Sequence, residues 1–191
     1  MKTLAKITAV AFILTAALSL NVQAQTAGNP RAKLSVGPET GLPVGDLRDR
    51  YQWTLGGSIQ AEFPIYRDWV ALTVNAGFYN LFAEEGGYTI GGIRYLDDLQ
   101  VLPAKLGVKY FPVAGLYIHG EAGAAFLLNK SNGGYENSAA FTYAPQVGYR
   151  FNLGNQSFLD TGVKWEGNSR FSDGAAANNY MGLRVAYGFS L

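Results

Sequence analysis

The feature that most constrains the fold is a two-residue alternation of side-chain character, which is most regular over residues 180–191. Every second position there is apolar, namely Met181, Leu183, Val185, Tyr187, Phe189 and Leu191. The positions between are small or charged, namely Gly182, Arg184, Ala186, Gly188 and Ser190. Successive side chains of a β-strand point to opposite faces of the sheet. The segment therefore predicts a strand with one apolar face.

The same period recurs along the chain and predicts strands near residues 33–42, 52–63, 69–79, 101–110, 116–127, 140–151, 158–166 and 180–191. Three connections are short: Pro64–Asp68, Pro112–Gly115 and Asn152–Ser157. Four are long and polar: Pro43–Tyr51, Asn80–Asp98, Asn129–Ser138 and Gly167–Asn178. Short turns at one end and long loops at the other are typical of outer-membrane barrels. We expect an all-β, eight-stranded antiparallel up-and-down transmembrane β-barrel with periplasmic turns and outer loops.

Composition narrows the functional classes. The chain has 24 glycines and 14% aromatic residues, which favour β structure over a helical enzyme domain. It has no cysteine, so disulfides, thiolate metal sites and cysteine nucleophiles are excluded. Its 15 basic and 14 acidic residues form no basic cluster, so no nucleic-acid partner is expected.

The start of the chain has the features of a secretory signal peptide. Lys2 and Lys6 precede a predominantly apolar stretch from Ile7 to Leu20, and Ala24 offers a small residue before Gln25. We expect residues 1–24 to be cleaved and residues 25–191 to form one barrel domain. The alternative is an uncleaved anchor, but the apolar stretch is shorter than the ~20 residues that a membrane span requires.

The two strand faces differ in charge and in aromatic placement. The apolar face carries no charged residue, and its aromatic side chains gather near both strand ends, as in the girdles of a membrane barrel. The other face carries five acids and five bases among many glycines: Glu39, Glu62, Lys105, Lys109, Glu121, Arg150, Asp160, Lys164, Glu166 and Arg184. Small residues and balanced charges suit the narrow interior of eight strands. We therefore expect these ten charges to be structural and to line the lumen.

Reflection of the hairpins about their turns predicts two interior pairs. Lys105 is expected opposite Glu121, and Arg150 beside Asp160.

A soluble barrel of lipocalin type also has alternating apolar and polar residues, but its apolar face points inward. A barrel with an inward apolar face would be a secreted carrier of a small apolar ligand, which remains one of the functional alternatives.

Several segments together resemble the small outer-membrane β-barrel proteins of OmpA/OmpX-like architecture, in particular the PorT-like "outer membrane β-barrel" group. The matching segments are residues 36–46 (VGPETGLPVGD), 57–64 (GSIQAEFP), 103–110 (PAKLGVKY) and 117–123 (YIHGEAG). The resemblance covers nearly all of the chain after residue 24 and implies a fold, because members of such a group share no single activity. The chain ends in Leu191 rather than in the terminal aromatic residue commonest in such barrels.

A catalytic alternative rests on the only histidine. His119 and Glu121 share a strand face, and Ser58, Thr73 or Thr142 could supply a nucleophile, as in an outer-membrane lipid A acyl hydrolase. The favoured interpretation is that His119 and Glu121 belong to the interior charge network. A single histidine also argues against a metal site, and no cofactor is expected.

The remaining expectations concern partners. The paired carboxylates Glu84-Glu85 and Asp97-Asp98 could hold a divalent cation or cross-bridge lipopolysaccharide, although a merely solvated loop is the favoured interpretation. Outer-membrane lipids, lipopolysaccharide and an unknown extracellular partner of the loops are expected. The barrel-assembly machinery is expected to engage the last strand through Tyr187, Phe189 and Leu191. The favoured function is a non-porin structural anchor that presents four surface loops.

Overall fold

The computed structural model describes residues 31–83, 88–89, 92–93, 98–128, 139–169 and 178–191. The predicted signal peptide, residues 1–24, lies outside this range. Among the described residues, no helix is long and apolar enough to span a membrane.

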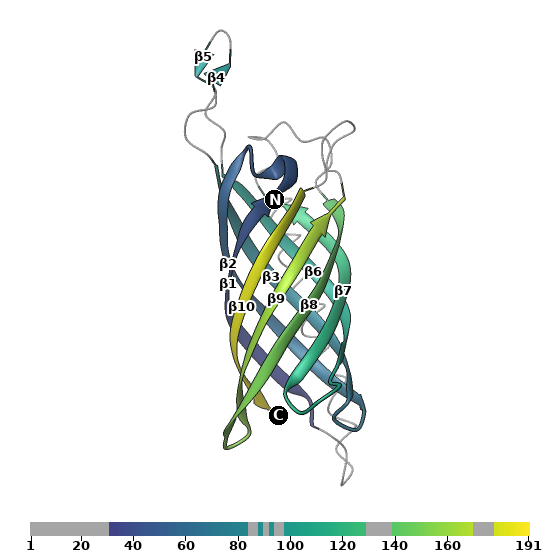
Figure 1. Cartoon of the computed structure of the whole chain (residues 1–191). Coiled ribbons are helices and arrows are strands. Elements are labelled where there is room, and N and C mark those ends of the chain that lie inside the picture. Colours follow the sequence, from purple (N-terminus) through teal and green to yellow (C-terminus); the bar gives the residue numbers. More distant parts are fainter. Residues whose placement is uncertain (1–30, 84–87, 90–91, 94–97, 129–138, 170–177) are drawn as a thin grey trace.

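Eight long strands close into one antiparallel barrel, as Figure 1 shows. They are β1 (Lys33–Val44), β2 (Tyr51–Tyr66), β3 (Val70–Ala83), β6 (Leu99–Tyr110), β7 (Leu116–Leu127), β8 (Ala139–Gly154), β9 (Ser157–Asn168) and β10 (Asn178–Ser190). Their order around the barrel is β1-β10-β9-β8-β7-β6-β3-β2, so neighbours in sequence are neighbours in space. The first and last strands close the sheet, with Leu34 opposite Phe189 and Glu39 opposite Arg184. The predicted fold class is confirmed.

The turns at one end of the barrel are tighter than the sequence pattern predicts. β8 and β9 continue to a two-residue turn at Asn155 and Gln156, whose φ angles of 50° and 64° match the twist of a hairpin. β2 runs past Pro64 to Tyr66, with a register irregularity between these two residues, and proline within a sheet is commonly found beside such irregularities. Strand pairing therefore continues through residues that were expected to form turns.

The connections at the other end are longer and carry two additional elements. A short 3-10 helix, η2 (Gly45–Leu47), follows β1 and turns back over the barrel rim. The small hairpin of β4 (Tyr88–Thr89) and β5 (Gly92–Ile93) stands beyond the rim in Figure 1. We call this end the long-loop end and the opposite end the short-turn end.

The barrel interior has two layers. A charged layer occupies its middle and its short-turn half. An apolar layer fills the long-loop end and consists of Leu47, Tyr51, Tyr79, Leu81, Leu99, Val101, Ala125, Leu127 and Ala140. Leu47 is 2% exposed, so η2 closes this end of the barrel with an apolar side chain.

Candidate functional site

All ten charged residues expected in the lumen are buried inside the barrel. None is more than 8% exposed. Because an unpaired buried charge is strongly unfavourable, each must find opposite charge nearby.

The ion pairs join all ten residues into one continuous network. At one end, Lys105 contacts Glu121 at 3.2 Å and Glu166 at 2.8 Å. Lys164 contacts Glu166 at 2.9 Å and also pairs with Glu39. Each contact joins a cation to an anion, and the network contains five cations and five anions.

Arg184 links the two halves of this network. Its Nε lies 3.3 Å from Glu39, and its Nη1 lies 3.3 Å from Asp160. Lys109 then contacts Asp160 at 2.9 Å and Glu62 at 3.2 Å, and Arg150 contacts Glu62 at 2.7 Å. The charged layer is thus a single electrostatic unit that ties together β1, β2, β6, β7, β8, β9 and β10.

Neutral groups complete the hydrogen bonding of the two central acids. Tyr117 donates its hydroxyl to Asp160 at 2.6 Å, and Gln146 donates to the Tyr117 oxygen at 2.7 Å. Tyr79 donates to Glu39 at 2.6 Å, and Ser58 also donates to Glu39. These hydrogen bonds stabilise the buried carboxylates in the narrow interior.

Aromatic rings enclose the cation nearest the short-turn end. The Arg150 guanidinium lies 4.6 Å from the ring centroids of both Phe111 and Phe158. These contacts, together with the pair to Glu62, fill the lumen at this level.

The two predicted interior pairs differ in how well the structure supports them. Arg150 lies opposite Asp160 in the β8–β9 register, with a closest approach of 3.7 Å. Lys105 contacts Glu121, but its register partner is Gly123 rather than Glu121. The expected register was wrong by two residues because the first two residues of β7 pair with β8 alone. The side chains still meet diagonally on the same face.

The residues proposed for catalysis lie inside the barrel wall. His119 is 1% exposed, and its Nε2 lies 2.9 Å from Thr73 Oγ1 and 3.8 Å from Glu121 Oε1. Ser58 instead bonds Glu39 and Arg184. Thr142 is fully buried and has no contact with His119 among the described hydrogen bonds. Thr73 is 2% exposed. Its hydroxyl group therefore points into the lumen, where membrane lipid does not reach it.

Gly107 explains how His119 reaches Thr73 across an intervening strand. A Cβ at Gly107 would lie 2.7 Å from Thr73 Oγ1 and 2.8 Å from His119 Nε2. The missing side chain leaves the space in which the imidazole crosses β6. The interior glycines expected from the sequence therefore act as packing positions for larger neighbours.

The loop carboxylates are described only in part. Glu84, Glu85 and Asp97 lie outside the described residues. Asp98 accepts hydrogen bonds from Asn80 Nδ2 at 2.9 Å and from the Ala83 backbone N–H at 3.0 Å, so it holds the end of β3. Within the described part of the chain, no group of three or more His, Asp and Glu side chains is arranged to hold a metal ion.

The apolar layer is the part of the interior that the alternation pattern does not predict. The signal was present at three pairs of consecutive apolar residues: Leu81-Phe82, Val101-Leu102 and Phe126-Leu127. At each pair one side chain faces outward and the other faces inward. Because both residues are apolar, the inward side chain indicates that the interior is apolar at this level of the barrel. The cavity beside Leu47, Tyr79 and Tyr180 has a volume of about 10 Å³, which holds about one water molecule.

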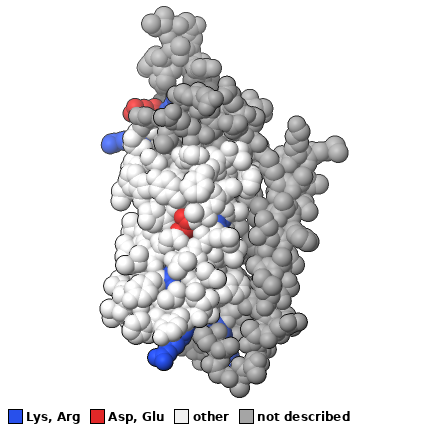
Figure 2. Space-filling model, turned by 90° about the vertical axis from the view of Figure 1, so that its right-hand side faces the viewer, with Lys and Arg blue, Asp and Glu red and all other residues white. Residues whose placement is uncertain are grey.

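The outer surface of the barrel is apolar along its length. Mid-strand side chains such as Leu106 and Leu183 are 65% and 47% exposed. Figure 2 shows a largely white side, with Lys and Arg atoms prominent at its lower end and a few acidic and basic atoms visible at mid-height. Exposed aromatic residues form a band at the long-loop end, comprising Trp53, Phe78, Phe141, Tyr143 and Trp165. A second band at the short-turn end comprises Tyr66, Trp69, Tyr110, Tyr149, Phe151, Tyr187 and Phe189.

The chain is similar in structure to several solved outer-membrane proteins. The chain is similar to the outer membrane protein OprG from Pseudomonas aeruginosa, with a TM-score of 0.52 and 12% identity over 85% of this chain and 96% of that one. It is also similar to the outer membrane protein AlkL in lipid bilayers, with a TM-score of 0.52 and 17% identity over 90% and 95% of the two chains. Neisserial surface protein A matches with a TM-score of 0.50 and 12% identity over 84% and 97%. No protein-family model and no curated protein sequence matches the chain.

The chain has the fold of a small outer-membrane β-barrel. In an outer-membrane β-barrel of this size, outward side chains meet lipid and inward side chains fill the lumen. The two aromatic bands then mark the membrane interfaces, and the ion-pair network lies between them.

Proposed function

We propose that the protein is an integral outer-membrane anchor whose barrel does not conduct and whose long loops carry its interactions. The observation that carries this proposal is the closed network of ten alternating charges across the lumen. Buried charges that contact one another directly leave no row of solvated groups along which an ion could pass. Closure of the long-loop end by Leu47 supports the same conclusion.

The remaining parts of the proposal rest on the predicted signal peptide and on the last strand. Residues 1–24 would be removed during export, and residues 25–191 would fold in the outer membrane. Tyr187 and Phe189 on β10, and Leu191 directly after it, are 52%, 39% and 48% exposed and would offer apolar side chains to the assembly machinery. Membrane lipids and lipopolysaccharide would surround the aromatic bands, and an extracellular partner would meet the loops.

Cell fractionation combined with surface proteolysis tests this proposal. The mature protein should remain with outer membranes through high salt and carbonate washes and should migrate differently on gels before and after heating. Protease added to intact cells should cut within residues 84–97 or 129–138 and leave the barrel whole. Recovery of the protein in the soluble periplasm would contradict the proposal and would favour the secreted ligand-binding barrel.

A further inference from the structure

The two ends of the barrel differ in charge. Among the described residues, the charged side chains at the short-turn rim, outside the ten-residue network, are Arg31, Lys33, Arg67 and Asp68, so bases outnumber acids by three to one. The sequence of the long-loop end, over residues 45–50, 84–98, 129–138 and 169–177, contains eight acids and five bases. The short-turn end is therefore the cationic end of the molecule.

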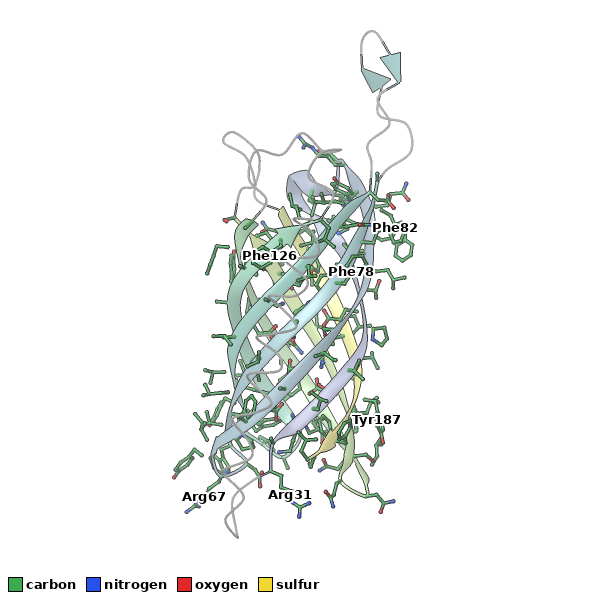
Figure 3. The ribbon with its side chains drawn as sticks, turned by 180° about the vertical axis from the view of Figure 1, so that it is seen from behind. Arg31, Arg67, Phe78, Phe82, Phe126 and Tyr187 are labelled. Carbon is green, nitrogen blue, oxygen red and sulfur yellow. The ribbon has the colours of Figure 1, made fainter. Side chains whose placement is uncertain are left out.

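Arg67 occupies a backbone position that does not favour arginine. Its φ angle is 48°, in the left-handed region where glycine and asparagine are preferred. The guanidinium lies 5.9 Å from the Tyr66 ring and projects from the β2–β3 turn, as Figure 3 shows. Turn geometry therefore does not itself favour an arginine at this position.

Arg31 projects from the same end of the barrel in Figure 3. Its Nη1 donates to Gln156 Oε1 at 2.8 Å, which fixes the side chain against the β8–β9 turn. Arg31 and Gln156 line an open groove of about 350 Å³ together with Lys33, Asp68 and Ser190. Lys33 is partly covered and lies 3.9 Å from Asp68, so Arg31 is the more accessible cation of the groove.

Apolar and aromatic side chains place the turn that carries Arg67 at a membrane interface, at the same end of the barrel as Arg31. Ile65, Tyr66 and Trp69 are 57%, 61% and 54% exposed and flank the turn that carries Arg67. Tyrosine and tryptophan concentrate at the level of lipid head groups. A guanidinium held at this level forms paired hydrogen bonds with phosphate oxygens.

We propose that Arg31 and Arg67 bind the phosphate of anionic phospholipids in the leaflet at the short-turn end. The proposal rests on the membrane-spanning placement of the barrel given above. The ligand chemistry is a phosphodiester whose head group adds no positive charge, such as phosphatidylglycerol. A zwitterionic head group is disfavoured because its own cation would meet the same arginines.

Tryptophan quenching by brominated lipid measures this preference directly, since Trp69 lies two residues from Arg67. The double substitution Trp53→Phe/Trp165→Phe leaves Trp69 as the single tryptophan. The protein would be folded into phosphatidylcholine vesicles that contain a fixed fraction of brominated phosphatidylglycerol or of brominated phosphatidylcholine. Brominated phosphatidylglycerol should quench Trp69 more strongly, and Arg31→Gln and Arg67→Gln should each lower the relative binding constant about fivefold.

Two controls separate a lipid site from a general effect of charge. Arg48→Gln removes an exposed cation at the long-loop end and should leave the quenching of Trp69 unchanged. Trp69→Phe/Trp165→Phe leaves Trp53 at the other aromatic band, where the two brominated lipids should quench about equally. Arg67→Gly should strengthen folding in pure phosphatidylcholine, because glycine suits the φ of 48°, while it weakens the lipid preference.

Equal quenching of Trp69 by both lipids would overturn the proposal, as would an equal loss in Arg48→Gln. A protein that fails to acquire its heat-modifiable form in vesicles would instead contradict the membrane-spanning placement itself. The two failures are therefore distinguishable on the same samples.

Discussion

Arg150 Nη2 lies 2.7 Å from both carboxylate oxygens of Glu62, a residue on the strand directly across the barrel. Three strands separate β8 from β2 in either direction around the sheet. Arg150 approaches its register partner Asp160 only to 3.7 Å. Side chains therefore connect opposite walls through the lumen, so a substitution on one wall changes the contacts of residues on the other.

Asp160 is expected to be the most sensitive acid in the lumen. It contacts Lys109, Arg184 and Arg150 and accepts the Tyr117 hydroxyl, so Asp160→Ala removes opposite charge from three cations at once. We expect a loss of about 3–5 kcal/mol in unfolding free energy. Urea unfolding in lipid vesicles measures it, with the exposed Asp49→Ala as a control that should change stability by less than about 0.5 kcal/mol. Equal effects of the two substitutions would show that the pairs contribute nothing.

Glu121 lies at the end of the network, and its loss should be milder. Glu121→Ala leaves Lys105 with its contact to Glu166, so the cost should be smaller than that of Asp160→Ala. Lys105→Met in the same chain should restore much of the lost stability because it removes the surplus charge, and Lys164 remains beside Glu166. His119→Ala should cost less than Glu121→Ala. If the double variant is no more stable than Glu121→Ala, the Lys105–Glu121 contact does not account for the stability lost in Glu121→Ala.

The sequence predicts which side chains face inward but not which of them meet. Alternation assigns Glu62 and Arg150 to the lumen correctly because parity is a local property of each strand. Their contact depends on strand number, tilt and closure, which no single segment encodes. The turn positions predict neighbours along a ladder, such as Arg150 and Asp160, and miss partners across the barrel.

The apolar layer was missed for a different reason. Leu47 comes from a loop, where alternation has no meaning, and enters the barrel only because η2 folds back over the rim. Leu81 was expected in the loop Asn80–Asp98, but β3 continues to Ala83. Val101 is followed by the outward Leu102, so no polar residue marks the inward face there. These residues can be predicted only if the barrel interior is expected to change from charged to apolar along the barrel axis.

Gly107 and Gly120 offer a matched pair for the role of interior glycines. A Cβ at Gly107 would lie 2.6 Å from the Gly120 carbonyl oxygen and close to both Thr73 and His119, whereas a Cβ at Gly120 meets nothing within 4 Å. Gly107→Ala should therefore cost about 1–3 kcal/mol through overpacking. Gly120→Ala should be neutral or slightly stabilising. Vesicle unfolding curves compare the two, and a tolerated Gly107→Ala would mean that the imidazole does not cross β6.

Leu183 tests whether the outward face meets lipid. It lies near the middle of β10 and is 47% exposed. Leu183→Arg should lower the stability in bilayers by about 2–4 kcal/mol, the cost of a cation at the membrane midplane. The same substitution near a strand end, Phe189→Arg, should cost less. A neutral effect at Leu183 would indicate that water covers this surface.

Conductance in planar bilayers tests the closed barrel most directly. Purified protein, shown by its heat-dependent gel migration to be folded, would be added to a planar membrane under an applied voltage. The account predicts no steady channel, because Lys105, Lys109 and Arg184 are held by acids across the lumen and Leu47 closes the long-loop end. Stable, large single-channel conductance from the folded protein would contradict it.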